Sequence, residues 1–474
     1  MIFPQNPFID GKSCPPRNGE RLQLIDPANG EPFAEVGAAG PGEIEAAVAG
    51  AQRAFESGWR DMAPGKRAEI LFAIAAKLRA HADEIAHLDM RNVGKPIADA
   101  RDEAALGARV FEYYAGAGSK FFGQTIPVAR GGFNFTLRQP MGVIAAIVPW
   151  NFPFPIACWK VAPALAAGNC VVLKPASLSP LSALRLGELA HEAGLPAGVL
   201  QVVPGAGGAI GDAFVGHPLV RKVSFTGSTE IGARIMALAA RGIKRVSLEL
   251  GGKSPNIIFA DADIDKAAST SPMSVFANAG QDCCARSRVF VERPVFDRFV
   301  EKFIDSMRAL KVGQPAEPGT QIGPLVSRQQ RESVEAYLAT AKGREIIGGE
   351  RIEGPGFFLR PAAVLGCEPT DTVWREEIFG PVVCIRPFDD EAAMLREVND
   401  SPYGLSGSIW TNDLKRALRV VRRVESGVLS VNSHSSVHVE APFGGFKQSG
   451  IGRDLGMNAL EGYTELKNVF ISED

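Results

Sequence analysis

Hydrophobic residues recur at every third or fourth position through the first quarter of the chain, with charged residues between them. This spacing is typical of helices that bury one face, and it predicts three long helices. They cover residues 43–55, 66–88 and 97–115.

After Gly142 the pattern changes to short apolar runs that alternate with helical segments. Such alternation is typical of parallel strands joined by crossover helices, so we expect a doubly wound α/β sheet that binds ligands beyond the carboxyl ends of its strands. The predicted strands are residues 143–148, 170–174, 199–203, 222–226 and 245–250, and the predicted helices are residues 155–167, 181–193, 209–215 and 230–240.

A second alternating region begins near Pro255 and predicts another α/β unit. Before the first sheet, residues 124–140 alternate Thr, Val, Phe and Arg around a Gly131-Gly132 turn, which predicts a hairpin. A lone hairpin is marginally stable, so we expect it to pair across subunits or with the late apolar strand 467–471. The second unit is predicted to have strands at 257–259, 287–291, 382–386, 406–410 and 427–431, and helices at 264–279 and 295–310.

The composition indicates a globular protein of two or three structural units, since the chain has 474 residues, of which 46% are hydrophobic. A net charge of −2 lacks the basic excess of proteins that bind nucleic acid, so we expect no nucleic-acid partner. The apolar runs are too short to cross a membrane. Seven scattered cysteines favour a reducing compartment and residues 1–12 carry no targeting signal, so we predict a cytoplasmic protein.

Cys283 and Cys284 follow a predicted helix, in a segment where Gly280 and Asp282 favour a loop. A thiol in such a loop can act as a nucleophile, or the pair can be two small buried residues. Adjacent cysteines lack the spacing of a zinc site and the six histidines form no ligand set, so we expect no metal.

Glu249 and Asn151 are the other candidates for chemistry. Glu249 lies in a predicted strand between Leu248 and Leu250, where burial would raise its pKa toward that of a general base; alternatively, it faces solvent or pairs with Lys253. Asn151 lies in the loop after the first sheet strand, where its amide can stabilise an oxyanion or cap the next helix.

Two strand ends suit a dinucleotide. Residues 224–229 run from a strand into a helix, so Gly227 and Ser228 can hold a pyrophosphate. Strand 170–174 ends near Lys174 and Ser177, which suit ribose hydroxyls. The glycines of residues 205–211 miss the dinucleotide-binding spacing by one residue and predict only a turn.

Together these segments resemble the NAD(P)-dependent aldehyde dehydrogenase superfamily over essentially the whole chain. The order and spacing of the motifs agree with that family, including the 34 residues from Glu249 to Cys283. The matching motifs are residues 149–153 (PWNFP), 168–169 with 174–175, 225–228 (FTGS), 248–255 (LELGGKSP), 280–281 with Cys283, 376–381 (EEIFGP) and 442–450 (PFGGFKQSG).

The resemblance implies an aldehyde dehydrogenase-like α/β fold of three parts. A Rossmann-type NAD(P)-binding domain is expected at residues 1–122 and 141–251, and an α/β catalytic domain at residues 252–446. A small β oligomerisation unit is expected at residues 123–140 and 447–474, which implies a homo-oligomer, either a dimer or a tetramer.

The resemblance also implies a mechanism. Cys283, not Cys284, would attack an aldehyde, and the Asn151 side chain with the main-chain N–H of Cys283 would hold the oxyanion. Glu249 would activate the water that hydrolyses the thioester to a carboxylic acid, and Lys160 resembles the proton-relay lysine of the family. The alternative is a CoA-acylating semialdehyde dehydrogenase, and Glu249 argues against it because acylating relatives generally lack this base.

The cofactor implied is NAD, with NADP as a second candidate. Ser177 replaces the Glu with which many NAD-preferring members grip the adenosine ribose, so the carboxylate that would repel a 2′-phosphate is missing. Use of both cofactors is therefore expected. The cofactor contacts of the family carry over to Trp150, Lys174, Ser177, Phe225, Gly227, Ser228, Leu250, Glu377 and Phe379.

The substrate is the least defined part of the prediction. Asp282 beside the nucleophile and Glu440 in the loop 433–440 would favour a cationic aldehyde if both line the substrate tunnel, and otherwise they are ordinary solvated acids. Asp282 and residues 111–116 (FEYYAG) also resemble members that act on aminoaldehydes or betaine aldehyde. Because Asp282 would oppose thiolate formation, we expect a compensating donor or positive charge nearby.

Overall fold

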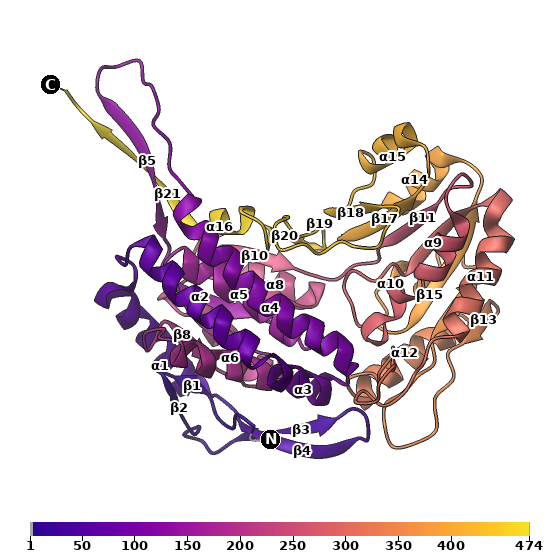
Figure 1. The fold of residues 1–474 in the computed structure, drawn as a ribbon, viewed down its shortest axis with the longest axis horizontal. Coiled ribbons are helices and arrows are strands. Elements are labelled where there is room, and N and C mark those ends of the chain that lie inside the picture. Colours follow the sequence, from indigo (N-terminus) through magenta and orange to yellow (C-terminus); the bar gives the residue numbers. More distant parts are fainter. Residues whose placement is uncertain (1–2, 474) are drawn as a thin grey trace.

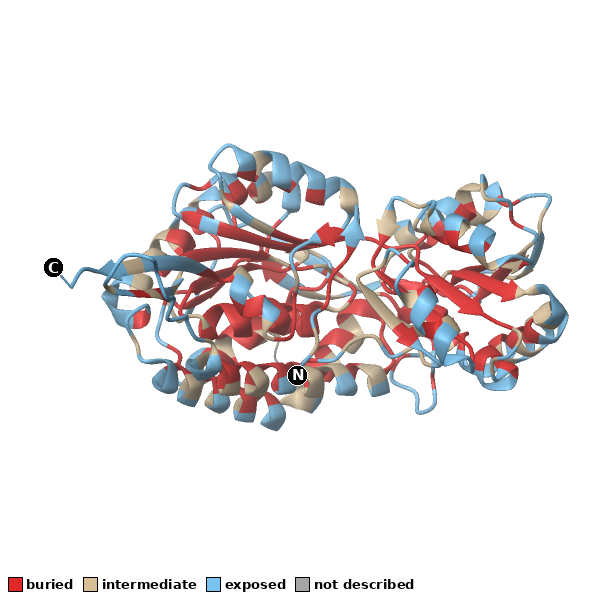
Figure 2. Ribbon diagram, turned by 90° about the horizontal axis from the view of Figure 1, so that it is seen from above, coloured by how far each residue is buried: buried red, intermediate tan, exposed pale blue. Residues whose placement is uncertain are grey.

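The computed structural model describes residues 3–473, which form two α/β lobes and a thin two-stranded arm (Figure 1). Residues 1, 2 and 474 lie outside the described residues. Residues 1 and 2 belong to the predicted cofactor domain and to the segment 1–12 predicted to carry no targeting signal, and residue 474 belongs to the predicted oligomerisation unit. Each lobe has its own buried apolar cluster, and the strands of both sheets are buried between exposed helical faces (Figure 2).

The first lobe is built on an eight-stranded sheet of order β2-β1-β8-β7-β6-β9-β10-β20. The five strands from β8 to β10 are parallel, and β1 and β20 run antiparallel to their neighbours. The chain order reverses at β6, which makes this the switch point of a doubly wound sheet and confirms the predicted fold class. The strands are β1 (Phe8–Ile9), β2 (Lys12–Ser13), β6 (Val143–Ile147), β7 (Cys170–Lys174), β8 (Leu200–Val202), β9 (Val220–Thr226), β10 (Arg245–Glu249) and β20 (Gly450–Ile451).

One predicted helix of the first lobe is divided in two, and short helices at residues 55–59, 118–120 and 458–462 were not predicted. The single helix expected at residues 66–88 is wrong, because His81 leaves helical geometry (φ −108°, ψ 15°) and separates two helices. Apolar spacing resumes after the break, so periodicity alone does not reveal it. The helices are α1 (Pro41–Ala54), η1 (Phe55–Trp59), α2 (Pro64–Ala80), α3 (Ala82–Val93), α4 (Ile97–Ala117), η2 (Gly118–Lys120), α5 (Pro153–Ala166), α6 (Leu181–Glu192), α7 (Gly207–Gly216), α8 (Thr229–Ala240) and α16 (Asn458–Gly462).

The second lobe holds a seven-stranded sheet of order β13-β14-β15-β12-β11-β17-β18, parallel except at its β13 edge. Its strands are β11 (Pro255–Ile258), β12 (Arg288–Glu292), β13 (Glu345–Gly348), β14 (Ala362–Leu365), β15 (Val382–Phe388), β17 (Ser406–Trp410) and β18 (Val428–Val431). Its helices are α9 (Ile264–Thr270), α10 (Met273–Phe276), η3 (Ala277–Gly280), η4 (Arg293–Val295), α11 (Phe296–Arg308), α12 (Arg328–Thr340), α13 (Thr372–Arg375), α14 (Glu391–Asn399) and α15 (Leu414–Val421).

The continuous helix expected at residues 264–279 is also wrong. Pro272 cannot donate a helical hydrogen bond and separates α9 from α10, and Asn278 and Ala279 adopt left-handed geometry. These breaks bring the chain round to the loop that carries Cys283. The segment before α1, for which no strands were predicted, also contains β1, β2 and the hairpin of β3 (Arg21–Asp26) with β4 (Glu31–Gly37).

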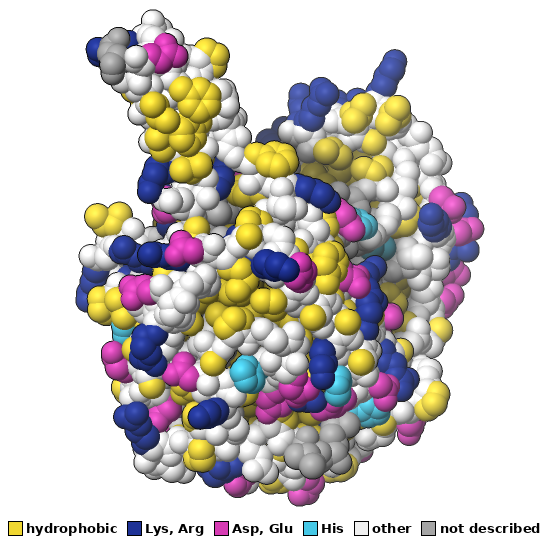
Figure 3. Space-filling view, turned by 60° about the vertical axis from the view of Figure 1, so that its left-hand side comes forward, with side chains coloured by type: hydrophobic (Ala, Val, Ile, Leu, Met, Phe, Trp, Pro, Cys, Tyr) yellow, Lys and Arg dark blue, Asp and Glu magenta, His cyan; other side chains and the backbone are white. Residues whose placement is uncertain are grey.

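The arm consists of β5 (Phe133–Pro140) and β21 (Thr464–Ile471), which pair antiparallel along their whole length. The predicted pairing of the hairpin segment with the late apolar strand is thus confirmed. A second small pair joins β16 (Tyr403–Gly404) to β19 (Phe446–Lys447). Apolar side chains gather on the face of the arm seen in Figure 3, and Phe133, Leu466 and Ile471 are each at least half exposed. Between residues 3 and 473, no helix is long and apolar enough to cross a membrane.

Candidate active site

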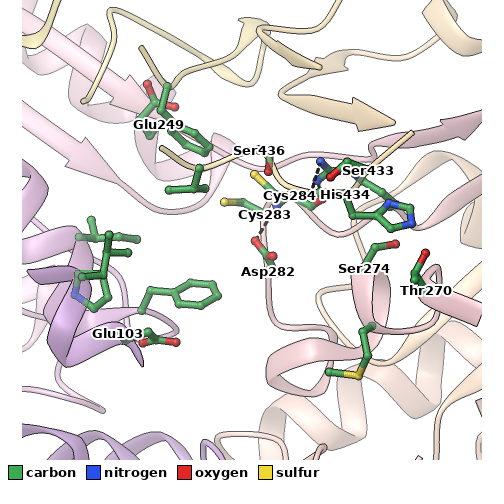
Figure 4. A pocket seen from close by; sticks show the side chains of 18 of the residues that line it. Glu103, Glu249, Thr270, Ser274, Asp282, Cys283, Cys284, Ser433, His434 and Ser436 are labelled. Carbon is green, nitrogen blue, oxygen red and sulfur yellow. Dashed lines mark hydrogen bonds between the residues drawn. The ribbon is translucent and has the colours of Figure 1, made fainter. Parts of the chain in front are cut away.

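A pocket of about 590 Å³ is lined by residues of both lobes. The first lobe contributes Glu103 from α4 and Glu249 from the end of β10, and the second contributes Cys283 with its neighbours. In Figure 4, Glu249 and Glu103 approach from one side, and Asp282, Cys283 and Cys284 lie across the cavity from them. Aromatic rings also line the pocket, namely Phe152, Trp159, Trp410 and Phe443.

Cys283 is half-buried in the loop between η3 and β12, whereas Cys284 is buried. The Asp282 carboxylate accepts a hydrogen bond from the main-chain N of Cys284 at 2.8 Å, which fixes the loop. The neighbouring Cys284 thiol, burial and the Asp282 carboxylate all raise the pKa of Cys283.

Arg286 supplies the positive charge expected near Asp282. Its side chain is buried, lines the pocket, and donates to the main-chain oxygen of Cys284 and, at 3.1 Å, to Ser408 Oγ. The guanidinium opposes the effect of burial on the pKa of Asp282. Arg286 therefore offsets part of the negative field beside Cys283.

Asn151 is buried, and its Nδ2 donates to the main-chain oxygen of Gln281 at 2.9 Å, two residues before Cys283. The N-cap of α5 is Phe152, so the alternative in which Asn151 caps this helix is wrong. The Asn151 amide instead points at the loop that carries Cys283.

Glu249 ends β10 and is only 4% exposed. Neither carboxylate oxygen has a hydrogen-bond partner among the described residues, and the Lys253 ammonium is likewise unpaired, so the alternatives of a solvated or Lys253-paired Glu249 are wrong. Burial, followed by the Asp454 carboxylate, raises the pKa of Glu249 well above its usual range. A desolvated, unpaired carboxylate in the pocket suits a general base.

Lys160 lies on α5, and its Nζ contacts Asp454 Oδ2 at 2.9 Å and Ser224 Oγ at 3.1 Å. The Lys160 ammonium lowers the pKa of Glu249, so the ion pair acts on the carboxylate electrostatically. Sequence reasoning missed Asp454, because it follows the last recognised motif and joins Lys160 only in the folded chain.

The expected pyrophosphate residues lie where β9 meets α8. Ser228 is the N-cap of α8 and its Oγ accepts from Ile231 N at 3.4 Å, and the first main-chain N–H groups of a helix are free for an anion. A Cβ at Gly227 would lie 2.4 Å from the Phe225 ring, and a Cβ at Gly232 would lie 2.5 Å from the Leu250 side chain. This tight packing shapes the turn.

The residues expected at the ribose and the nicotinamide are Glu377, Trp150 and Phe379. Glu377 Oε1 accepts from Gly252 N at 3.0 Å, and burial raises the pKa of Glu377 to about 7. The Trp150 and Phe379 rings meet edge to face at 5.3 Å. Any side chain at Gly251 would clash with Glu377, because a Cβ there would lie 2.1 Å from its carboxylate.

Lys174 and Ser177 lie at the end of β7. Burial lowers the pKa of Lys174 to about 8, and Ser177 Oγ donates to the main-chain oxygen of Gly205 at 3.0 Å. A helix N-terminus, a buried lysine, a hydroxyl and an acid are thus present among the expected cofactor residues, and these residue types fit a dinucleotide.

The two acids expected in the substrate tunnel are separated by the structure. Asp282 lines the pocket, whereas Glu440 is exposed and does not. Glu103, which sequence reasoning missed, lines the pocket instead; its Oε1 pairs with Lys95 and its Oε2 is buried without a partner. Burial raises the pKa of Glu103 to about 7.

Among residues 3–473, Asp282, Cys283 and Cys284 form the single group of potential metal ligands that lie together, with their ligand atoms within 4.8 Å of one another. Structural zinc sites use four ligands, so this group falls one short.

A sequence profile described as the Aldehyde dehydrogenase family matches residues 15–469. The chain belongs to the aldehyde dehydrogenase family. The betaine aldehyde dehydrogenase of Cereibacter sphaeroides is 40% identical over 468 residues, which cover 98% of this chain and 96% of that protein. These matches confirm the family that the motifs indicated.

Solved structures of aldehyde dehydrogenases share the fold. The indole-3-acetaldehyde dehydrogenase AldA of P. syringae, in complex with NAD+ and IAA, has a TM-score of 0.98 and 40% identity, with 100% of this chain and 97% of that chain covered. A Staphylococcus aureus betaine aldehyde dehydrogenase in complex with NAD+ has a TM-score of 0.97 and 36% identity, with 100% and 95% covered. The predicted α/β aldehyde dehydrogenase fold is therefore confirmed.

Proposed function

We propose that this aldehyde dehydrogenase oxidises its substrate to a carboxylic acid with NAD+ through a thioester on Cys283. The observation that carries the proposal is that Glu249, with both oxygens buried and unpaired, lines the same pocket as Cys283. A base placed so can serve hydrolysis of a thioester on that sulfur.

The Cys283 thiol first gives its proton to the Glu249 carboxylate, which lines the same pocket and releases it to solvent. The thiolate adds to the aldehyde carbon, and the carbonyl oxygen becomes an oxyanion that accepts hydrogen bonds from Asn151 Nδ2 and Cys283 N. NAD+, when bound, would supply the acceptor for the hydride of this carbon, and loss of that hydride leaves a thioester. Glu249 then takes a proton from water, whose oxygen adds to the thioester carbon. The C–S bond breaks, the thiolate returns, the acid leaves, and Glu249 releases its proton to solvent.

The N-terminus of α8, the Glu377 carboxylate beside Gly252 and relatives solved with NAD+ support the cofactor proposal. Because Ser177 carries no charge and Lys174 lies three residues before it, we propose that NADP is also accepted. The seven cysteines are free, which fits the cytoplasmic location that we propose.

For the substrate class, we propose an aldehyde that carries a positive charge. Besides the candidate base Glu249, the acids Asp282 and Glu103 line the pocket, where Arg286 and Lys95 offset part of their charge. The aromatic rings of the lining add faces that attract cations. The related betaine aldehyde dehydrogenase of Cereibacter sphaeroides supports this class. A panel that pairs betaine aldehyde and 4-aminobutyraldehyde with neutral aldehydes of similar size tests it, and equal kcat/KM for both groups would contradict it.

The base is tested by Glu249→Ala. We expect one enzyme equivalent of NADH to form in a burst and steady turnover to stall, because the thioester no longer hydrolyses. Glu440→Ala is the control, since it removes an exposed acid outside the pocket. Parent-like turnover of Glu249→Ala would contradict the hydrolytic role, and product formation that requires coenzyme A would favour the acylating alternative.

A further inference from the structure

The main-chain oxygen of Asn151 is held by two buried side chains. Lys95 Nζ donates to it at 3.0 Å, and Asn278 Nδ2 donates to it at 3.1 Å. Lys95 is 1% exposed and Asn278 is 5% exposed. These two donors come from different lobes, since Lys95 precedes α4 and Asn278 lies in η3.

The Asn278 amide also contacts the nucleophile loop. Its Nδ2 donates to the main-chain oxygen of Gln281 at 3.2 Å, and the same oxygen accepts the hydrogen bond from Asn151 Nδ2. Gln281 Nε2 in turn donates to the main-chain oxygen of Asn278 at 2.9 Å. The Asn278 amide group therefore joins the backbone of Asn151 to the loop that carries Cys283.

The backbone at this point is unusual. Asn278 (φ 51°), Ala279 (φ 56°) and Gly280 (φ 71°) are three consecutive left-handed residues. Asn is the non-glycine residue that tolerates this region best, and its side chain supplies two N–H donors. A glycine could adopt the same backbone, but only Asn adopts it and also donates to both carbonyls.

We propose that Asn278 is a positioning residue for the oxyanion site, and that Lys95 provides the second anchor of the Asn151 backbone. The inference rests on the proposed function, in which the Asn151 amide stabilises the oxyanion formed at Cys283. Oxyanion donors act through preorganised geometry, so loss of the Asn278 donor misplaces the Asn151 amide relative to Cys283.

Two substitutions test Asn278. Asn278→Asp keeps the size and the backbone tolerance but places carboxylate oxygens against two carbonyl oxygens. Asn278→Gly keeps the backbone conformation without strain and lacks any donor. The control is Asn399→Asp, since Asn399 Nδ2 also donates to a carbonyl, that of Arg423, but contacts neither Asn151 nor the loop that carries Cys283.

The readout is the rate of the first NADH burst at saturating aldehyde and NAD+, compared with the rate at which iodoacetamide alkylates Cys283. Alkylation needs the thiolate but forms no oxyanion. We expect both Asn278 variants to slow the burst about 10- to 100-fold. We expect the alkylation rate and the KM for NAD+ of Asn278→Gly, which adds no charge near Cys283, to stay within about twofold of the parent, because those steps do not use the oxyanion donors.

Asn151→Ala serves as the reference variant. It separates the proposed role of Asn151 as the oxyanion donor from the proposed positioning role of Asn278. If Asn151→Ala keeps the parent burst rate, the proposed role of Asn151 itself fails. If Asn151→Ala is slow while both Asn278 variants keep the parent burst rate, the positioning role is overturned. Equal losses of burst and alkylation in both Asn278 variants would show a merely structural role and would also overturn it.

Discussion

Lys160 and Asp454 form an ion pair whose Nζ and Oδ2 atoms are 2.9 Å apart, with side chains 0% and 1% exposed. They act on the candidate base in opposite directions, because Asp454 raises the pKa of Glu249 and Lys160 lowers it. The pair also joins a buried hydroxyl cluster, since Ser224 Oγ lies 3.1 Å from each of Lys160 Nζ, Ser247 Oγ and Tyr463 OH. The basicity of Glu249 thus depends on charges that lie outside its own strand.

Removal of one member of the pair is predicted to move the acid limb of the kcat–pH profile. Asp454→Asn deletes the negative charge, so the pKa of Glu249 falls and the limb moves to lower pH. Lys160→Met deletes the positive charge, so the limb moves to higher pH. Loss of one partner of a buried pair costs about 3–5 kcal/mol, so folding is verified by circular dichroism at the assay temperature. Shifts in the same direction would contradict this electrostatic coupling.

Glu377 is predicted to make stability pH-dependent. Burial raises its pKa from the usual 4.5 to about 7, so folding favours the protonated form. The stability that it contributes is complete below about pH 4.5 and is lost as pH rises through about 7. Glu377→Gln keeps an acceptor for Gly252 N and cannot ionise, so relative to the parent it gains up to about 3 kcal/mol between pH 4.5 and 8.

The measurement is the melting temperature of the cofactor-free protein at pH 5, 6, 7 and 8. The exposed neighbour Glu376 offers the matched control Glu376→Gln. A constant difference between Glu377→Gln and the parent at all four pH values would argue against a raised pKa.

Local pattern was enough to predict most strands of both sheets and the residues of the central motifs. Cys283 and Glu249 lie in short motifs at strand or helix ends, where sequence spacing carries the information. His81 and Pro272 show where pattern fails, since apolar spacing continues across a helix break.

The missed site residues share a different cause. Lys95, Glu103 and Asp454 are charged residues that would be assigned to solvent by residue type. Lys95 and Asp454 are buried and Glu103 is partly buried, and each meets a partner of opposite charge in the folded chain; one such partner lies 294 residues away. Glu440 shows the opposite case. This charged residue, just before the motif 442–450, was expected to line the substrate tunnel, but it lies outside the pocket.

Ser177→Glu is predicted to change the cofactor preference. A carboxylate at this position can accept hydrogen bonds from ribose hydroxyls and repels a 2′-phosphate. We expect KM for NADP to rise at least about 10-fold, while KM for NAD+ stays equal or falls. Ser177→Gln adds similar volume without charge and should leave the ratio of the two KM values near that of the parent. A rise in both KM values by the same factor would mean that the volume of the new side chain, and not its charge, weakens cofactor binding.

The arm is predicted to form the interface of a dimer or tetramer. Leu466 and Phe470 lie on one face of β21, since strand side chains alternate, and they are 55% and 43% exposed. Apolar faces of this kind are covered by a partner in stable proteins. The double variant Leu466→Lys/Phe470→Lys places like charges against each other across a symmetric contact, so a smaller species is expected by size-exclusion chromatography with light scattering. Lys467→Glu changes a charge between these positions and should keep the parent mass. An unchanged mass in the double variant would place the interface elsewhere.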